Sequence, residues 1–198
     1  MLTEKIPTPC ATEVEKYLER WNTLESYVLQ ESSLEKLFVK AFPKNTDADE
    51  VLAKVAVLND FYSTNIFKTY NVAMHIICLD IDERLEQGDE TLVNDIAVVD
   101  VGNGKTMNFY SFATKYCSHH KPKDYPIYDS YIDEVLRYAR KEDGFYKFRN
   151  NDLKDYITFK NILLEFQKFY GLENFDLKEI DKYLWQLGKE FFSKKYYK

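Results

Sequence analysis

Glycine and proline are scarce in this chain, with 6 glycines and 5 prolines among 198 residues. A fold built from many short strands needs frequent tight turns, and these two residues form most of them. The scarcity therefore favours long helices with few interruptions. Hydrophobic residues make up 45% of the chain and charged residues 30%, which is typical of a folded protein. We expect an all-α fold, a compact multi-helix orthogonal bundle that forms a single helical domain over residues 1–198.

Apolar residues recur with helical spacing in several stretches of the chain. One stretch is residues 12–31, with Thr12 as the expected N-cap. Asp176 and Glu179 have the spacing of a capping box at the start of the last helix. The same reasoning predicts helices over about residues 32–38, 51–62, 66–79, 89–99, 106–120, 129–139 and 153–170.

The net charge of −6 is unevenly distributed along the chain. Residues 1–100 hold 9 Lys and Arg against 19 Asp and Glu, whereas residues 101–198 hold 18 against 14. The acidic first half argues against broad, non-specific binding of nucleic acid, which depends on neutralising phosphates. The basic second half is compatible with a local anion-binding site, or with ordinary solvated charge on helix faces.

Three cysteines, Cys10, Cys78 and Cys117, are an odd number without paired spacing, which favours reduced thiols. The N-terminal segment lacks an apolar signal, and no apolar run is long enough to span a bilayer. We therefore expect a cytoplasmic protein that does not enter membranes. Cys117, His119 and His120 are possible metal ligands, but Cys117 and His119 point apart on a helix. The sequence also offers no second pair of ligands. We therefore expect no metal and no cofactor.

A polar stripe follows one face of the helix predicted over residues 106–120. Asn108, Ser111, Lys115 and His119 lie at helical spacing, and the stripe carries less charge than a solvent-facing surface usually does. The stripe is either a solvated or partly buried polar face, or the wall of a polar pocket.

Asp129 is expected at the N-cap of a helix, after an extended, proline-stiffened segment over residues 125–128. A carboxylate in this position first of all stabilises the helix, by roughly 1 kcal/mol. Because the segment before it is stiff, the same carboxylate could also be held rigidly against a lysine.

The order of these features resembles that of the helix–hairpin–helix (HhH-GPD) DNA glycosylase superfamily, over about residues 55–140. Residues 102–105 (GNGK) are similar to the hairpin glycines and lysine of that superfamily, and residues 121–129 to its closing segment with the catalytic aspartate. Residues 58–65 occupy the place of the family helix that contributes to the base pocket. The chain looks most like 8-oxoguanine DNA glycosylases, including compact forms associated with bacterial phage defence. The resemblance implies a helix–hairpin–helix element within the bundle.

The resemblance also implies an activity: a DNA glycosylase, with or without lyase activity, that excises a modified purine such as 8-oxoguanine. In this chemistry a lysine amine attacks the sugar C1′ and an aspartate stabilises the cationic sugar. The implied catalytic residues are Lys115 or Lys105, together with Asp129. The flipped base stacks on aromatic or apolar side chains. The residues implied to bind the substrate are Tyr62, Ser63, Asn65, Gly102, Gly104, Ser111, His119 and Tyr128.

The sequence departs from the family pattern at the hairpin. Residues 99–101 (VDV) stand where the family has Leu-Pro, and Lys105 follows Gly104 directly, where the family usually has one residue between. The second helix is also longer, which separates Lys105 from Asp129. Lys115 is therefore favoured slightly over Lys105 as the nucleophile.

Two other functions remain open from the sequence. The chain could be a catalytically silent module of the same fold that binds nucleic acid, a nucleotide or a base, which the altered hairpin favours. Alternatively, the acidic first half could serve a protein partner in a bacterial defence system. DNA is the partner expected if the chain is a glycosylase.

Overall fold

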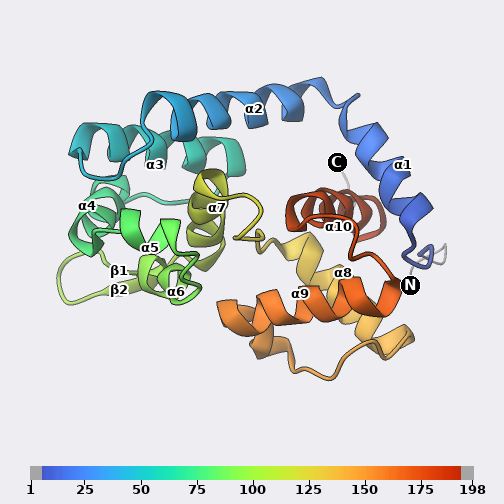
Figure 1. Ribbon diagram of the computed structural model, residues 1–198. Coiled ribbons are helices and arrows are strands. Elements are labelled where there is room, and N and C mark those ends of the chain that lie inside the picture. The colour runs from blue at the N-terminus through green and yellow to red at the C-terminus, as the bar shows by residue number, and fades with distance from the viewer. Residues whose placement is uncertain (1–5, 193–198) are drawn as a thin grey trace, which may run out of the picture. The chain divides into compact units, whose positions relative to one another are not determined.

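The computed structural model describes residues 6–192 and is mostly helical, which confirms the prediction of an all-α fold (Figure 1). The described residues form ten α-helices, a π-helix (η1), a 3-10 helix (η2) and one two-stranded sheet. In chain order the elements are α1 (Ala11–Trp21), α2 (Glu25–Glu35), η1 (Lys36–Ala41), α3 (Ala48–Tyr62), α4 (Thr69–Leu79), α5 (Asp82–Glu86), α6 (Thr91–Ala97), β1 (Val98–Asp100), β2 (Thr106–Asn108), α7 (Tyr110–His120), α8 (Ser130–Glu142), η2 (Asn150–Lys154), α9 (Tyr156–Tyr170) and α10 (Leu177–Phe192).

The chain divides into two compact units. The central unit comprises residues 25–127, and the terminal unit comprises residues 6–24 and 128–192 within the described range. The sequence predicted one helical domain over residues 1–198, and its glycosylase-like region, about residues 55–140, contains residues of both units.

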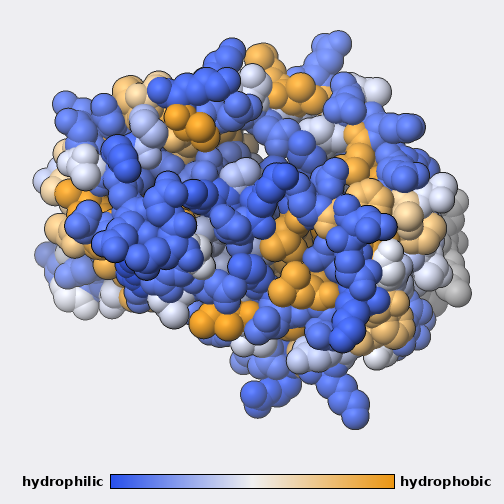
Figure 2. Space-filling model, viewed as in Figure 1, coloured by the Kyte–Doolittle hydropathy of each residue, from blue (hydrophilic) through white to orange (hydrophobic). Residues whose placement is uncertain are grey.

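Polar residues dominate the face of the molecule that Figure 2 shows. Hydrophilic side chains cover most of the face shown in Figure 2, with smaller apolar areas between them, as expected when 30% of the residues are charged. Within residues 6–192, no helix is long and apolar enough to cross a membrane.

The core of the central unit forms where α3, α4, α6 and α7 bury their apolar faces. Helix α3 begins after Asp47, whose carboxylate accepts hydrogen bonds from the N–H groups of Asp49 and Glu50 and so caps the helix. The buried apolar residues recur at helical spacing: Val51, Val55 and Leu58 on α3, Val72 and Ile76 on α4, Leu92, Val93 and Ile96 on α6, and Phe112, Ala113 and Tyr116 on α7.

The glycine-rich segment forms a β-hairpin between α6 and α7. Strands β1 and β2 pair antiparallel, with Val98 opposite Asn108 and Asp100 opposite Thr106. The turn uses three consecutive residues of positive φ, Gly102 (91°), Asn103 (56°) and Gly104 (69°), which is the conformation that Asn-Gly turns favour. The predicted helix over residues 106–120 is therefore wrong at its start, because Thr106–Asn108 pair as a strand and the helix begins at Tyr110.

The predicted helix over residues 89–99 is also shorter in the structure. Helix α6 begins at Thr91 rather than at Asp89, whose carboxylate accepts a hydrogen bond from Thr91 N at 2.9 Å. It ends at Ala97 because the valines that follow, Val98 and Val99, belong to β1. β-Branched residues favour the extended backbone of a strand, and the turn beyond them allows the pairing.

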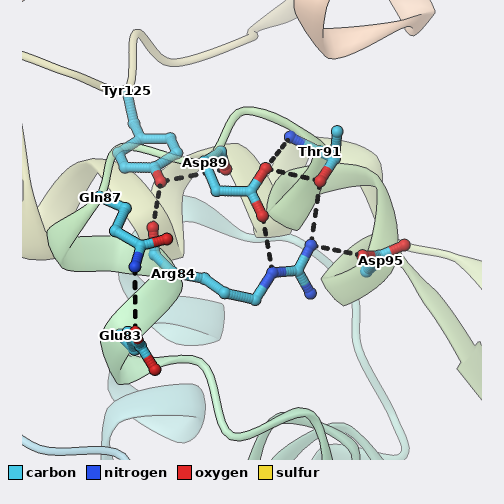
Figure 3. A network of polar contacts seen from close by, with 7 residues as sticks. All are labelled: Glu83, Arg84, Gln87, Asp89, Thr91, Asp95 and Tyr125. Carbon is cyan, nitrogen blue, oxygen red and sulfur yellow. Dashed lines mark hydrogen bonds and ion pairs between the residues drawn. The ribbon is translucent and has the colours of Figure 1, made fainter.

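A network of polar contacts joins α5, α6 and the segment after α7 (Figure 3). The guanidinium of Arg84 forms ion pairs with Asp89 and Asp95, each at 2.7 Å, and donates to Thr91 Oγ1 at 3.0 Å. The hydroxyl of Tyr125 donates to the carbonyl oxygen of Asp89 at 3.1 Å. This network fixes the chain that leaves α7, because Tyr125 is fully buried.

The terminal unit consists of α1, α8, η2, α9 and α10. Helices α8 and α10 approach closely at Gly188, where an added Cβ would lie 2.6 Å from the Cβ and from the carbonyl oxygen of Tyr131. The predicted capping box of α10 is confirmed, since Asp176 Oδ1 accepts from Glu179 N at 3.0 Å and Glu179 Oε2 accepts from Asp176 N at 2.8 Å.

The helix predicted over residues 12–31 is wrong in two respects. It is interrupted between α1 and α2 at residues 22–24, and α1 begins at Ala11, so Thr12 is not its N-cap. Cys10 occupies the cap position without a side-chain hydrogen bond. The apolar spacing continues through the break, which is why the pattern alone did not locate it.

Candidate functional site

Helix α7 presents three polar side chains, Ser111, Lys115 and His119, one turn apart along one face. The side chain of Lys115 is 2% exposed, and its Nζ donates to Ser111 Oγ at 2.6 Å. Burying an ammonium is costly unless polar groups surround it. The stripe from Ser111 to His119 is therefore buried or half-buried rather than fully solvated, which fits both a partly buried polar face and the wall of a pocket.

Tyr62, in the last turn of α3, completes this group of side chains. Its hydroxyl lies 3.0 Å from Nε2 of His119, a hydrogen bond in which the histidine tautomer determines the donor. The Lys115 ammonium lies 5.2 Å from the centre of the Tyr62 ring, within the range of a cation–π contact. We call Tyr62, Ser111, Lys115 and His119 the Lys115 cluster. It brings an amine, two hydroxyls and an imidazole together within the central unit.

The end of α3 explains how Tyr62 is positioned. Ser63 takes a left-handed conformation (φ 48°) and ends the helix. The side chain of Asn59 then holds the following loop, since its Oδ1 accepts from Thr64 Oγ1 at 2.8 Å and from Ile66 N at 2.9 Å. Asn65 also has positive φ (57°). Ser63 and Asn65, two of the expected substrate-binding residues, are therefore exposed loop residues directly after Tyr62.

The hairpin residues lie outside the cluster. Gly102 and Gly104 form the β-turn, and Lys105 is exposed at its end, with its backbone carbonyl accepting from Val101 N at 2.9 Å. Asn108 belongs to β2 and is exposed, so the stripe expected from Asn108 to His119 starts at Ser111 instead. The expected helix placed Asn108 on the same face as Ser111, and the strand removes it from that face.

Asp129 and Tyr128 belong to the terminal unit. Asp129 is the N-cap of α8 as predicted, with Oδ1 accepting from Tyr131 N at 2.8 Å. Tyr128 is buried, and its hydroxyl donates to Asp133 Oδ2 at 2.9 Å and accepts a hydrogen bond from Lys154. Burial, together with the bond to Asp133, raises the pKa of Tyr128 above its ordinary value.

A second group of polar side chains, centred on Asn45 and reaching α7, was not predicted from the sequence. The amide oxygen of Asn45 accepts three hydrogen bonds: from Lys54 Nζ at 2.6 Å, from Tyr116 OH at 2.6 Å and from His120 Nε2 at 3.2 Å. The amide nitrogen of Asn45 donates to Asp82 Oδ1 at 2.7 Å. We call these five residues the Lys54 cluster, and all of them belong to the central unit.

The Lys54 ammonium is completely buried, with 0% of the residue exposed. It also donates to the carbonyl oxygens of Phe42 at 3.1 Å and Lys44 at 2.8 Å, so three oxygens surround it. Burial lowers the pKa of Lys54 to about 8, although the Asp82 carboxylate opposes the shift. This lysine anchors the turn before α3.

His120 is neutral in this environment. Burial, followed by the nearby Lys54 ammonium, lowers the pKa of His120 to about 3. Because the amide nitrogen of Asn45 is bonded to Asp82, the atom facing His120 is an oxygen, which can only accept. Nε2 of His120 therefore carries the proton, and Nδ1 is an acceptor.

A pocket of about 230 Å³ adjoins the Lys54 cluster. Its walls combine apolar side chains with charged ones: Phe38, Val39, Pro43, Lys44, Asp82, Leu85, Glu86, His120 and Lys121. The ring of Phe38 also lies 5.1 Å from that of His120 and 5.5 Å from that of His119, centre to centre, and so separates the two polar clusters.

One signal in the sequence could have indicated the Lys54 cluster. Lys54 shares a helical face with Val51, Val55 and Leu58, and a lysine on an otherwise apolar face requires buried partners. Asn45 and Asp82 carry no such signal, because each lies in a polar stretch of the sequence. Among residues 6–192, no group of three or more His, Cys, Asp or Glu side chains could hold a metal ion.

Comparison with known proteins finds one family model that spans both clusters. The family model HI_0787_N, described as an N-terminal domain, matches residues 13–124. The chain belongs to this family. The matched region of HI_0787_N covers both the Lys115 and the Lys54 cluster, whereas Asp129 lies beyond it.

The chain is also similar, over most of its length, to a known protein. An uncharacterized protein of Haemophilus influenzae is 50% identical over 151 residues, which are 76% of this chain and 72% of the relative. No solved structure matches the chain.

Proposed function

We propose that the chain is a DNA glycosylase that removes a modified purine, with Lys115 as its nucleophile. The observation that supports this proposal is the Lys115 cluster, in which an amine is bonded to Ser111 at 2.6 Å and lies beside the hydrogen-bonded pair of Tyr62 and His119. A covalent glycosylase needs such a fixed amine, together with groups that can move a proton.

In the proposed reaction the Lys115 ammonium first gives up a proton to water, which leaves a lone pair on its nitrogen. The neutral amine attacks the sugar C1′, the bond between C1′ and the base nitrogen breaks, and the electron pair of that bond leaves with the base, which takes up a proton. Loss of the amine proton and opening of the sugar ring then give a Schiff base. His119, paired with Tyr62, is suited to exchange these protons.

The comparison of the two lysine candidates favours Lys115. Lys105 is exposed at the end of a β-turn, where a long, flexible side chain is not held in a reactive geometry. Lys115 is held by two side chains of the central unit. Under this proposal the hairpin around Lys105 contacts DNA phosphates rather than the base.

Borohydride trapping tests the proposal, because it reduces a Schiff base to a stable link between protein and DNA. We expect the full chain to form such an adduct with duplex DNA that contains 8-oxoguanine. The adduct is lost in Lys115→Gln and retained in Lys105→Gln, a matched change at an exposed lysine. An adduct that survives Lys115→Gln, or no adduct and no base release with a panel of modified purines, would contradict the proposal.

The burial of Lys115 favours a second candidate function. With 2% of the residue exposed, the amine is covered in this structure, which favours a module of the same fold that binds a nucleic acid through exposed residues and does not react. That function gives salt-dependent binding of DNA without release of a base, in both the wild type and Lys115→Gln.

A further inference from the structure

The pocket beside the Lys54 cluster plays no part in the proposed glycosylase reaction. Its 230 Å³ lie next to His120, on α7, and next to Asp82, at the start of α5. An apolar cavity of about 150 Å³ holds benzene, so the pocket has room for a molecule about half as large again. Its walls are of mixed character, and that mixture indicates which ligand fits.

Two opposite charges line this pocket without pairing. Asp82 accepts hydrogen bonds only from the backbone and side-chain amides of Asn45 and forms no ion pair among residues 6–192. Lys44 is exposed, and within the same described range its ammonium has no ion pair either. By contrast, Lys121 and Glu86, which also line the pocket, pair with each other at 2.6 Å.

The remaining walls are apolar or neutral. Phe38, Val39, Pro43 and Leu85 contribute carbon surface, and His120 contributes an uncharged imidazole. A ligand that complements the whole pocket needs a cationic group for Asp82, an anionic group for Lys44, and an apolar part that packs against the carbon surface.

We propose that this pocket binds a free α-amino acid with an apolar side chain. Its ammonium pairs with Asp82, its carboxylate with Lys44, and its side chain packs against Phe38 and Leu85. A residue at one end of a peptide keeps only one of the two charges, so the pocket selects the free amino acid. The proposal goes beyond the glycosylase function and does not involve the Lys115 cluster.

Calorimetric titration of the full chain tests the need for both charges. The three probes are L-leucine, isocaproate, which lacks the ammonium, and isoamylamine, which lacks the carboxylate. We expect leucine to bind with a dissociation constant between about 10 μM and 1 mM, as is usual for so small a ligand. Each analogue should bind at least about tenfold more weakly, because one charge-assisted hydrogen bond is lost.

Variants locate the binding. Val39→Trp places a large side chain in the pocket from an exposed position and should abolish leucine binding, whereas Val28→Trp, at an exposed valine of α2 outside the pocket, should leave it unchanged. Lys44→Gln should weaken binding at least about tenfold without affecting the fold, since Lys44 is exposed. Lys115→Gln should bind leucine normally even if DNA trapping fails, which separates this proposal from the glycosylase function.

Three outcomes would overturn the proposal. They are the absence of leucine binding to the wild type at millimolar concentration, analogues that bind as tightly as leucine, and unchanged binding in Val39→Trp.

Discussion

Lys54 and Lys115 both lie in the central unit with almost no exposed surface, yet their surroundings differ. The Lys54 ammonium donates to three oxygens of one turn, two main-chain carbonyls and the amide oxygen of Asn45, although Tyr116 and His120 also lie near it. Lys115 is bonded to a serine hydroxyl and stands beside a tyrosine and a histidine, which can exchange protons. The three oxygens around Lys54 indicate that it anchors the turn, whereas the proposed function assigns Lys115 a chemical role.

We expect the largest effect in the DNA-trapping assay, when each of the two lysines is replaced in turn by an uncharged residue. Lys115→Gln should reduce the trapped adduct at least about 1,000-fold, because removal of a nucleophile eliminates the covalent step. Lys54→Met should retain the adduct when it is assayed at a temperature at which the protein is folded. If both substitutions abolish trapping in folded protein, the distinction between the two lysines fails.

The free energy of unfolding should depend strongly on Lys54, which the trapping assay does not require. Lys54→Met removes the donor of the Phe42 and Lys44 carbonyl oxygens and one of the three donors of Asn45 Oδ1. We expect a loss of about 3 kcal/mol in the free energy of unfolding, measured with urea. Lys44→Met, in the same turn but exposed, should change this free energy by less than about 0.5 kcal/mol. Equal effects of the two substitutions would show that the buried ammonium does not anchor the turn.

Acid sensitivity tests the environment of His120. Its pKa is about 3 in the folded protein, against 6.5 ordinarily, so between these values the unfolded chain binds a proton that the folded chain does not. Stability is therefore lost as the pH falls below 6.5, by roughly 1.2 kcal/mol between pH 6 and pH 5 from this residue. The difference in unfolding free energy between the wild type and His120→Gln should shrink by that amount. A constant difference would contradict a neutral, buried imidazole.

The lowered pKa of Lys54 should change the free energy of unfolding at alkaline pH, by slightly less than His120 changes it in acid. The folded lysine loses its proton near pH 8, whereas the unfolded lysine keeps it to about pH 10.5. The wild type should therefore gain roughly 1 kcal/mol relative to Lys54→Met between pH 8 and pH 9. The raised pKa of Cys117 acts in the other direction above pH 9, but it cancels in this comparison because both proteins contain that thiol.

Much of the helical architecture could be predicted from the sequence, because apolar spacing and capping residues are local signals. Asp129 and the pair of Asp176 and Glu179 were located in this way. The start of α7 was not, because strand pairing at Thr106 competes with a helical pattern that looks continuous. The pairing of β1 with β2 therefore determines where α7 begins.

The candidate site was predictable in part. Ser111, Lys115 and His119 share a helix, so their spacing brought them together, and the resemblance to glycosylases added Tyr62. The Lys54 cluster depends on Asn45, Asp82 and His120, which are far apart in the sequence and meet only through the fold. No local pattern in the sequence predicts contacts between residues that are this far apart along the chain.

Mass-spectrometric mapping of the borohydride adduct is the most direct test of the chemical role of Lys115. The protein, trapped on duplex DNA containing 8-oxoguanine, is digested with protease and nuclease, and the lysine that carries the sugar remnant is identified. We predict a single modified site at Lys115, within the peptide of α7. Modification at Lys105, at several exposed lysines, or at none would contradict the account.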